Sequence, residues 1–219
     1  MVWNLPACAR RGDRIFAGCR SLEQDVELKD LSARYRGQID VLPLEITDAA
    51  RLDHCARQVQ SEVDALDLLI NNAAINAEGE TLRTFDAEKA AQQWMVNAVG
   101  QVLVAQKFLD LLKAGTDPKI INVTSEAGSI STMNRFRGYY YFGSKAAMNM
   151  FSRSMAWDPD TTGIITIALQ PGWMRTDMGG SIADLSVTES AEGILKVIAN
   201  LTSEDNGKFY TWEGKEYPW

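Results

Sequence analysis

The chain has 219 residues, of which 46% are hydrophobic, and its formal net charge is −7. This length suits one domain, because domains commonly run to ~100–200 residues and single α/β domains often exceed that. We therefore expect one domain over residues 1–219. The acidic balance argues against nucleic acid and anionic membranes as partners, so a nucleotide cofactor would need positive charge concentrated locally.

Other function classes are disfavoured by features that the sequence lacks. We find no apolar run of the ~20 residues that cross a bilayer, and no basic segment followed by an apolar stretch of the kind that marks a signal peptide. Cys8, Cys19 and Cys55 are scattered without a Cys-x-x-Cys pattern, which is typical of reduced thiols in a cytoplasmic protein. The single histidine, His54, has no Gly-x-Ser-x-Gly elbow to partner it. A serine hydrolase and a zinc site are both disfavoured.

In chain order, short apolar runs alternate with segments of helical periodicity. The expected strands start at Arg14, Ile39, Leu66, Ile120, Ile164 and Lys208. The expected helices cover residues 5–11, 22–35, 48–63, 86–114, a stretch carrying Tyr141 that ends near Trp157, and 186–201. This alternation predicts an α/β fold with a doubly wound, Rossmann-like parallel sheet. Ser186 and Glu189 have the spacing of a capping box for the last helix.

Small and polar residues follow several of these strands. Asn71-Asn72-Ala73-Ala74 ends one strand, Ser125 follows another, and Pro171-Gly172 follows a third. The carboxyl ends of parallel strands meet at one edge of a sheet, and open α/β sheets bind their ligands beyond that edge. The sequence therefore predicts a binding site where these three segments end.

Tyr141 and Lys145 stand four residues apart in the helix that follows Ser125. Residues at this spacing lie one above the other on the same helical face. An ammonium beside a phenol favours the phenolate and lowers the tyrosine pKa from its ordinary value of ~10. Such a pair can give or take a proton near neutral pH, although the spacing alone also fits an ordinary exposed helix face.

Together these elements resemble the short-chain dehydrogenase/reductase family. The matching residues are Asn71-Asn72-Ala73-Ala74, Asn97, Ser125, Tyr141 with Lys145, and Pro171-Gly172. The tail is similar to one branch, the C-factor and sniffer-type carbonyl reductases, in residues 171–180, residues 183–187 and the closing Tyr217-Pro218-Trp219. The resemblance runs from about Arg10 to the end of the chain.

The resemblance implies hydride transfer between a nicotinamide and a small carbonyl or alcohol substrate. Tyr141 would protonate the carbonyl oxygen, and Lys145 would lower the tyrosine pKa and bind the nicotinamide ribose. Ser125 would donate a hydrogen bond to the substrate oxygen, and Asn97 would hold a water that links Lys145 to solvent. Two alternatives stay open: Asn97 as a helix-kink residue and Ser125 as an ordinary strand-end hydroxyl. Tyr139 and Tyr140 are rivals to Tyr141, but neither has a lysine four residues later.

The resemblance also implies where the cofactor would lie. Arg20 follows the strand whose end faces the adenosine ribose, and an arginine there favours the extra phosphate of NADP over NAD; a solvated surface arginine is the alternative, and NAD stays open as cofactor. Glu45 stands where the family usually has an adenine-binding aspartate. The remaining contacts would come from Asn72 and Ala73 at the ribose and from Met174 and Thr176 at the nicotinamide carboxamide, besides Tyr141 and Lys145.

Members of that family begin with a strand that leads into a Thr-Gly-x-x-x-Gly-x-Gly turn, whose amides hold the cofactor's pyrophosphate. Here no glycine precedes Gly12, and Leu5–Arg11 is expected to be a short helix. A parallel crossover needs ~12 or more residues, so Val2–Leu5 does not fit as the missing strand. We expect a sheet without its first, central strand. The strands at Ile15 and Leu68, its usual neighbours, would either pair directly or leave a gap.

A shortened gene, a misassigned start codon or a natural decayed relative would each produce this sequence. The absent turn also keeps an alternative function open, namely an N-terminally truncated, catalytically silent relative that acts in binding or signalling. An epimerase or dehydratase would share the tyrosine–lysine pair but usually adds a large substrate domain, for which 219 residues leave no room. The sequence leaves the oligomeric state open, a homo-oligomer included.

Overall fold

The computed structural model describes residues 5–23, 25–77 and 79–219. The strands are β1 Ile15–Cys19, β2 Ile39–Pro43, β3 Leu68–Asn71, β4 Lys119–Val123, β5 Ile165–Gln170 and β6 Phe209–Thr211. The helices are α1 Leu5–Arg10, α2 Val26–Arg34, α3 Ala49–Gln60, α4 Ala87–Trp94, α5 Gly100–Lys113, α6 Tyr140–Trp157 and α7 Val187–Asn200, with short helices η1 Met95–Val99, η2 Glu126–Gly128, η3 Pro159–Thr161 and η4 Ser203–Asp205. The chain divides into two compact units, Met1–Val63 and Asp64–Trp219.

The predicted α/β class is confirmed. Each strand expected from the sequence is present, and the four ladders between named strands are all parallel. The short helix expected before the first strand is also present as α1. Of the segment Val2–Leu5, which the sequence does not favour as an additional strand, residues 2–4 lie outside the described residues and Leu5 belongs to α1.

The first unit contains the parallel pair β1–β2, in the register Ile15↔Ile39, with helices α1, α2 and α3. Its core contains Ala9, Leu31 and Ile39. Helix α2 begins at Val26, later than the expected Leu22, because the Asp25 side chain accepts the N–H of Leu28 and so caps the helix there.

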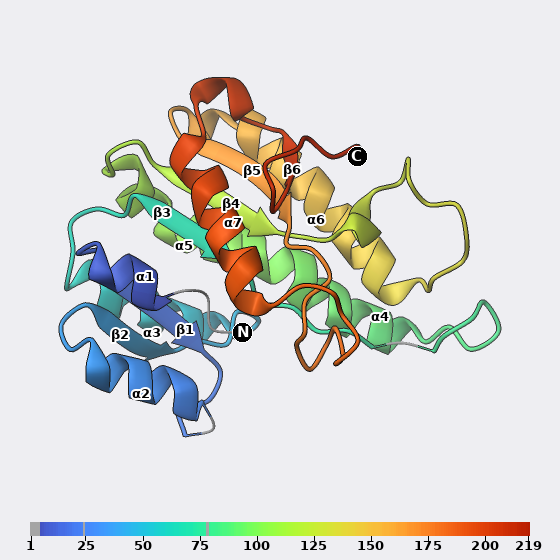
Figure 1. The fold of residues 1–219 in the computed structure, drawn as a ribbon, viewed down its shortest axis with the longest axis horizontal. Helices are drawn as coiled ribbons and strands as arrows, with labels where there is room; N and C mark the ends of the chain where they lie inside the picture. Colours follow the sequence, from blue (N-terminus) through green and yellow to red (C-terminus); the bar gives the residue numbers. More distant parts are fainter. Residues whose placement is uncertain (1–4, 24, 78) are drawn as a thin grey trace. The chain divides into compact units, whose positions relative to one another are not determined.

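The second unit contains the parallel sheet β3-β4-β5-β6. Every residue of β4 is buried, and in β5 all but Gln170 are buried, as expected for central strands covered on both faces. Figure 1 shows α7 on one face of this sheet and α5 and α6 on the other. The capping box at the start of α7 forms as predicted, with Ser186 accepting from the Glu189 N–H and Glu189 accepting from the Ser186 N–H.

Strands β1 and β3 belong to different sheets: β1 pairs with β2, and β3 is an edge strand of the four-stranded sheet. Among the described residues no ladder joins β1 to β3, and direct pairing of these two strands stays a prediction. In keeping with its edge position, β3 is partly open to solvent, and its Leu68 is 36% exposed. An edge strand leaves one row of its backbone groups without a ladder partner.

Helices α4, η1 and α5 follow one another without a break from Ala87 to Lys113. By length and composition this stretch of the described residues could cross a membrane, which the sequence analysis did not predict. The helix reaches this length because Met95–Val99 continues it as a π-helical segment. Half of its most apolar window is buried inside the protein.

Candidate active site

Helix α6 places Tyr141 and Lys145 together, as their spacing predicted. The Lys145 ammonium nitrogen lies 5.7 Å from the centre of the Tyr141 ring. Tyr141 is half-buried, whereas Lys145 is only 2% exposed. The Lys145 Nζ donates a hydrogen bond to the carbonyl oxygen of Val123, the last residue of β4, at 3.1 Å. The ammonium is therefore fixed between the helix and the carboxyl end of a central strand.

Burial has an electrostatic consequence for Lys145. Removal from water disfavours the charged form and lowers the pKa of the Lys145 ammonium from 10.5 to about 8. A buried lysine at this pKa exchanges its proton near physiological pH, which is the behaviour needed of a group in a proton relay. Strongly shifted groups of this kind are more common at functional sites than elsewhere.

Ser125 follows β4 and caps the short helix η2, its hydroxyl accepting the N–H of Ala127 at 3.1 Å. The turn packs directly on the backbone of α6: a Cβ added to Gly128 would lie 2.6 Å from the Lys145 carbonyl oxygen, so a glycine is needed there. Thr124 also donates to that carbonyl, at 3.3 Å. These contacts hold the Ser125 turn on the helix that carries Tyr141 and Lys145.

Asn97 lies in the π-helical segment η1 and is fully buried. Its side-chain oxygen accepts the N–H of Ile75 at 2.8 Å, and its side-chain nitrogen donates to the Ile75 carbonyl at 2.9 Å and to the Ser144 hydroxyl at 3.0 Å. Asn97 thus joins the loop after β3 to α6. These bonds fit the helix-kink alternative, and its part in a proton relay stays a prediction.

The segment after β3 is held by buried amides. Asn71 donates to the Asn122 side chain at 2.8 Å and to the Gln101 carbonyl at 3.2 Å, and the Gln101 side chain donates to the Ala73 carbonyl. Asn72 is half-buried and Ala73 is exposed. We did not predict a role for Gln101, although its position four residues after Asn97 places it on the same helical face.

Met174 and Thr176 lie in the loop that follows β5. Met174 is buried and forms a bridge with Leu185. The Thr176 hydroxyl accepts the N–H of Gly179 at 3.0 Å. Arg175, between them, donates to the carbonyls of Ala183 and Asp184 and ties the two sides of the loop together. The loop is therefore folded on itself by its own polar groups.

Arg20 and Glu45 belong to the first unit, apart from the other eight predicted site residues. Arg20 directly follows β1 and is exposed. Glu45 follows β2 and is half-buried, and its carboxylate accepts from the Thr47 hydroxyl at 3.0 Å. The structure gives Glu45 a local turn contact, and its contact with adenine stays a prediction.

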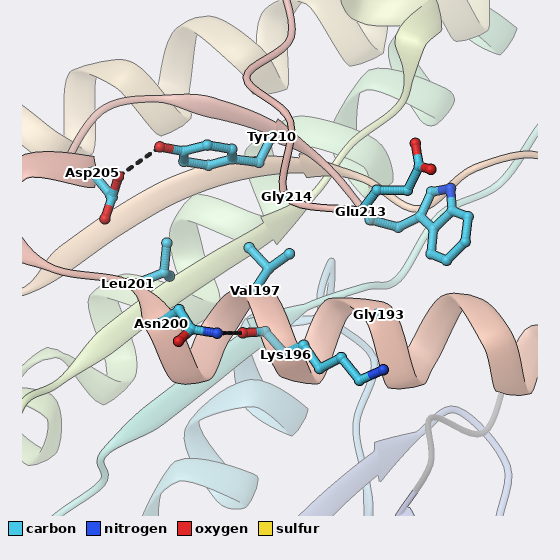
Figure 2. Close-up of a pocket in the computed structure, with 10 residues that line it drawn as sticks. Gly193, Lys196, Val197, Asn200, Leu201, Asp205, Tyr210, Glu213 and Gly214 are labelled. Carbon is cyan, nitrogen blue, oxygen red and sulfur yellow. Dashed lines mark hydrogen bonds between the residues drawn. The ribbon is translucent and has the colours of Figure 1, made fainter.

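A separate cavity of about 550 Å³ lies between α7 and the end of the chain (Figure 2). Figure 2 shows Asp205 and Tyr210 on one side and Val197, Lys196 and Asn200 of α7 on the other; the Tyr210 hydroxyl donates to Asp205 at 2.6 Å. None of the predicted site residues lines this cavity. We therefore do not assign this cavity to the active site.

Comparisons with known proteins find relatives that match most of the chain. The chain is 38% identical to the C-signal protein of Myxococcus xanthus over 154 residues, which cover 70% of this chain and 93% of that protein. A crystal structure of NADPH-bound carbonyl reductase from chicken fatty liver matches with a TM-score of 0.88 and 35% identity, covering 94% of this chain and 88% of that one. Carbonyl reductase Sniffer of D. melanogaster matches with a TM-score of 0.89 and 29% identity, with the same coverage.

The family comparison covers most of the chain. The model of the short chain dehydrogenase family matches residues 6–186, a range that includes strands of both units and the Tyr141–Lys145 pair. With the relatives above, this match shows that the protein belongs to the short-chain dehydrogenase/reductase family of oxidoreductases.

Proposed function

We propose that this protein is an NADP-dependent oxidoreductase that transfers a hydride between the nicotinamide and a small carbonyl or alcohol substrate. The observation that carries the proposal is the buried Lys145 ammonium beside Tyr141. A buried charge lowers stability unless it is compensated, and among the described contacts the Lys145 ammonium has one hydrogen bond, to the Val123 carbonyl, and the face of the Tyr141 ring. A role in the reaction explains why the charge is there.

The second unit fits the nicotinamide half of the cofactor. A lysine ammonium has three N–H donors, and one of those of Lys145 goes to the Val123 carbonyl. The other two can hold the ribose hydroxyls, with Met174 and Thr176 at the carboxamide and Asn72 and Ala73 at the adenosine ribose. When bound, the cofactor would supply the hydride that reaches the carbonyl carbon.

In reduction, Tyr141 gives its phenolic proton to the carbonyl oxygen as the carbon–oxygen double bond becomes a single bond. Lys145 stabilises the resulting phenolate and returns a proton to it. Ser125 donates a hydrogen bond to the substrate oxygen, where negative charge develops. Asn97 completes the relay between Lys145 and solvent. In oxidation of an alcohol the same groups act in reverse.

Two observations favour NADP over NAD. Arg20 is exposed directly after β1, where it can meet a 2′-phosphate, and the solved carbonyl reductase from chicken fatty liver holds NADPH. Glu45 would lie near the adenine. We further propose that residues 1–219 act as one domain, since the family match spans both units, and that the protein works in the cytoplasm, in keeping with its three free cysteines.

The alternative that the sequence leaves open, a catalytically silent relative with a binding or signalling role, is not favoured by the comparisons, which find oxidoreductases.

An assay of NADPH consumption with a panel of small aldehydes and ketones tests both candidates. We expect Tyr141→Phe to lower turnover by ~10²–10⁴-fold, the usual contribution of general acid catalysis, while cofactor affinity stays nearly unchanged. Tyr139→Phe is the matched control, because Tyr139 is a tyrosine of the same segment but has Gly143, and not a lysine, four residues later. A Tyr141→Phe variant that keeps most of its turnover would refute the role of Tyr141.

A further inference from the structure

A buried carboxylate that we did not single out in the sequence contacts the start of the catalytic helix. Glu80 is 7% exposed, although acidic side chains are almost never buried without partners. Its Oε1 accepts the backbone N–H groups of Tyr139 at 2.5 Å and Tyr140 at 2.8 Å. Gly138, at φ +111°, makes room for this approach, since a Cβ there would lie 2.9 Å from the same oxygen.

These N–H groups are the ones that a helix start leaves without partners. Helix α6 begins at Tyr140, and the side chain of the preceding Tyr139 makes no capping bond. The first N–H groups of any helix lack acceptors within the helix. A carboxylate at that end both accepts their hydrogen bonds and interacts favourably with the helix dipole. Glu80 therefore caps α6 from a segment about sixty residues earlier in the chain.

Further contacts fix the same two segments together. The Tyr140 hydroxyl accepts the N–H of Asp86 at 2.7 Å, and Tyr140 is 3% exposed. The Phe85 ring packs against Tyr139 and Tyr140, with ring centres 5.8 Å and 5.4 Å apart. The loop from Glu80 to Asp86 thus contacts the first turn of α6 at both ends of the loop, through Glu80 at one end and through Phe85 and Asp86 at the other. Tyr141 is the next residue of that turn.

We propose that Glu80 is a positioning residue for the reaction proposed above: by capping α6 it fixes the backbone of the first turn and with it the place of the Tyr141 phenol above Lys145. This inference rests on the proposed function for its catalytic consequence. Its structural part, the cap and its effect on Tyr141, stands independently of any activity.

Glu80 acts through the helix and not as an acid in its own right. Burial works to raise the pKa of its carboxyl, but the hydrogen bonds from the N–H groups of Tyr140 and Tyr139 outweigh burial and hold the pKa below its ordinary value of 4.5. The carboxylate is therefore ionised at neutral pH. Because the Glu80 carboxylate carries no proton and accepts hydrogen bonds from backbone N–H groups, its role is to position the helix and not to donate a proton.

The first arm of the test measures amide hydrogen exchange and needs no activity. We compare Glu80→Ala, which removes the cap, with Glu80→Gln, which keeps an acceptor oxygen but not the charge. In Glu80→Ala the N–H groups of Tyr139 and Tyr140 should exchange about ten- to a hundredfold faster, as for loss of a hydrogen bond to a charged group. Glu80→Gln should fall between, and the exposed Glu88→Gln is the matched control that changes nothing.

The second arm measures Tyr141 itself, in protein with ring-labelled tyrosine, whose Tyr141 signals are identified by their loss in Tyr141→Phe. We expect these signals to shift in Glu80→Ala and to return toward wild type in Glu80→Gln. Unchanged exchange at Tyr139 and Tyr140, or unchanged Tyr141 signals, would overturn the proposal. Because Glu80→Gln keeps the hydrogen-bonding shape, the test stands even where the alanine variant fails to fold.

The third arm addresses catalysis. In Glu80→Ala we expect kcat to fall about tenfold or more while the KM for NADPH stays the same, because a displaced general acid affects the chemical step, commonly worth ~10²–10⁴-fold. A kcat equal to wild type, in a protein where Tyr141→Phe is inactive, would overturn the positioning role. If Tyr141→Phe remains active, the proposed function fails instead, and the first two arms still decide whether Glu80 positions Tyr141.

Discussion

The two compact units differ in how well their strands are buried. In the first unit β1 has no fully buried residue and β2 has one, Ile39. In the second unit β4 is buried throughout, and β5 nearly so. Two-stranded sheets are marginally stable, whereas three or more strands with covered faces support themselves. The groups proposed for the chemistry thus stand on the better-buried sheet, and those proposed for NADP selection, Arg20 and Glu45, on the weaker one.

This contrast separates two properties that usually occur together in one enzyme. The groups proposed for proton transfer are held by buried contacts such as the bond of Lys145 to Val123 and those of Asn97 to Ile75 and Ser144. The groups proposed to meet the nucleotide are more open to solvent, since Arg20 is exposed and Glu45 is half-buried. Chemistry and cofactor affinity should therefore respond to different mutations.

The largest expected effect is on cofactor affinity. The chain should bind NADPH more than ~100-fold more weakly than a version in which a strand and a Thr-Gly-x-x-x-Gly-x-Gly turn are placed before Leu5, since two charge-assisted bonds to the pyrophosphate are worth about 3 kcal/mol or more. Calorimetric titration of both proteins measures this. Micromolar binding of NADPH by the chain without the added turn would contradict this prediction, because the chemistry and the cofactor affinity would then not differ in how well the protein supports them.

The second prediction concerns the cost of the buried ammonium. Lys145→Met removes the charge but keeps the length of the side chain, and it should abolish carbonyl reduction while stabilising the second unit by about 1–2 kcal/mol. Replacement of buried ionic groups by apolar ones of similar volume is often stabilising, and the loss of the bond to Val123 offsets part of the gain. Urea denaturation measures the change, and a less stable variant would contradict it.

The pH dependence of the wild type is the control for this prediction. The pKa of Lys145 is about 8 in the folded protein and 10.5 ordinarily, so between these values the unfolded chain binds more protons than the folded one. The free energy of unfolding contributed by this group therefore rises as the pH increases from about 8 to 10.5. Lys145→Met should lack this rise, and an equal rise in both proteins would assign it to another group.

A smaller effect is expected at Asp205, also in the second unit. Burial works to raise the pKa of its carboxyl, but bonds from the Tyr210 hydroxyl, Thr202 and Lys208 outweigh burial and lower the pKa from 3.8 to about 2. Asp205→Asn should cost the second unit about 1–2 kcal/mol at neutral pH. In the wild type this stability is present above pH 3.8 and is lost as the pH falls through about 2.

Denaturation curves of Asp205→Asn and of Glu204→Gln, an exposed neighbour, check this prediction. The amide exchange of β1 and β2 should be the same in both variants if the two units are stabilised separately. If Asp205→Asn made the amides of β1 exchange faster to the same extent as those of the second unit, the stability of the first unit would depend on the second. The two units would then unfold as one cooperative fold.

The sequence predicts the strands well because their signal is local. β-branched runs such as that around Ile120, and the capping box at Ser186, determine an element within a few residues. The Tyr141–Lys145 pair is predicted for the same reason, since its geometry follows from helical spacing. The division into two sheets is a property of strand order, for which periodicity carries no information.

The contacts that the sequence did not predict are long-range ones between polar groups. Glu80 and Tyr140 are about sixty residues apart in sequence, and Asn97 and Ser144 are also far apart. Neither partner carries a local pattern that names the other. The burial of Lys145, and with it the lowered pKa, likewise follows from packing of β4 and η2 on α6 and not from the residues next to it.

The smallest expected effect is on cofactor choice. Arg20→Asp, made in the version with the added glycine turn, should shift the ratio of NADP to NAD affinity about tenfold or more toward NAD, because an acidic residue repels the 2′-phosphate and binds the free hydroxyl. A tenfold shift is ~1.4 kcal/mol, modest because the arginine is exposed and solvent screens its charge. Arg36→Asp, an exposed arginine beyond α2, is the matched control. Equal ratios of NADP to NAD affinity in Arg20→Asp and Arg36→Asp would show that Arg20 does not contact the cofactor. The selection of NADP could then not be assigned to Arg20 in the first unit.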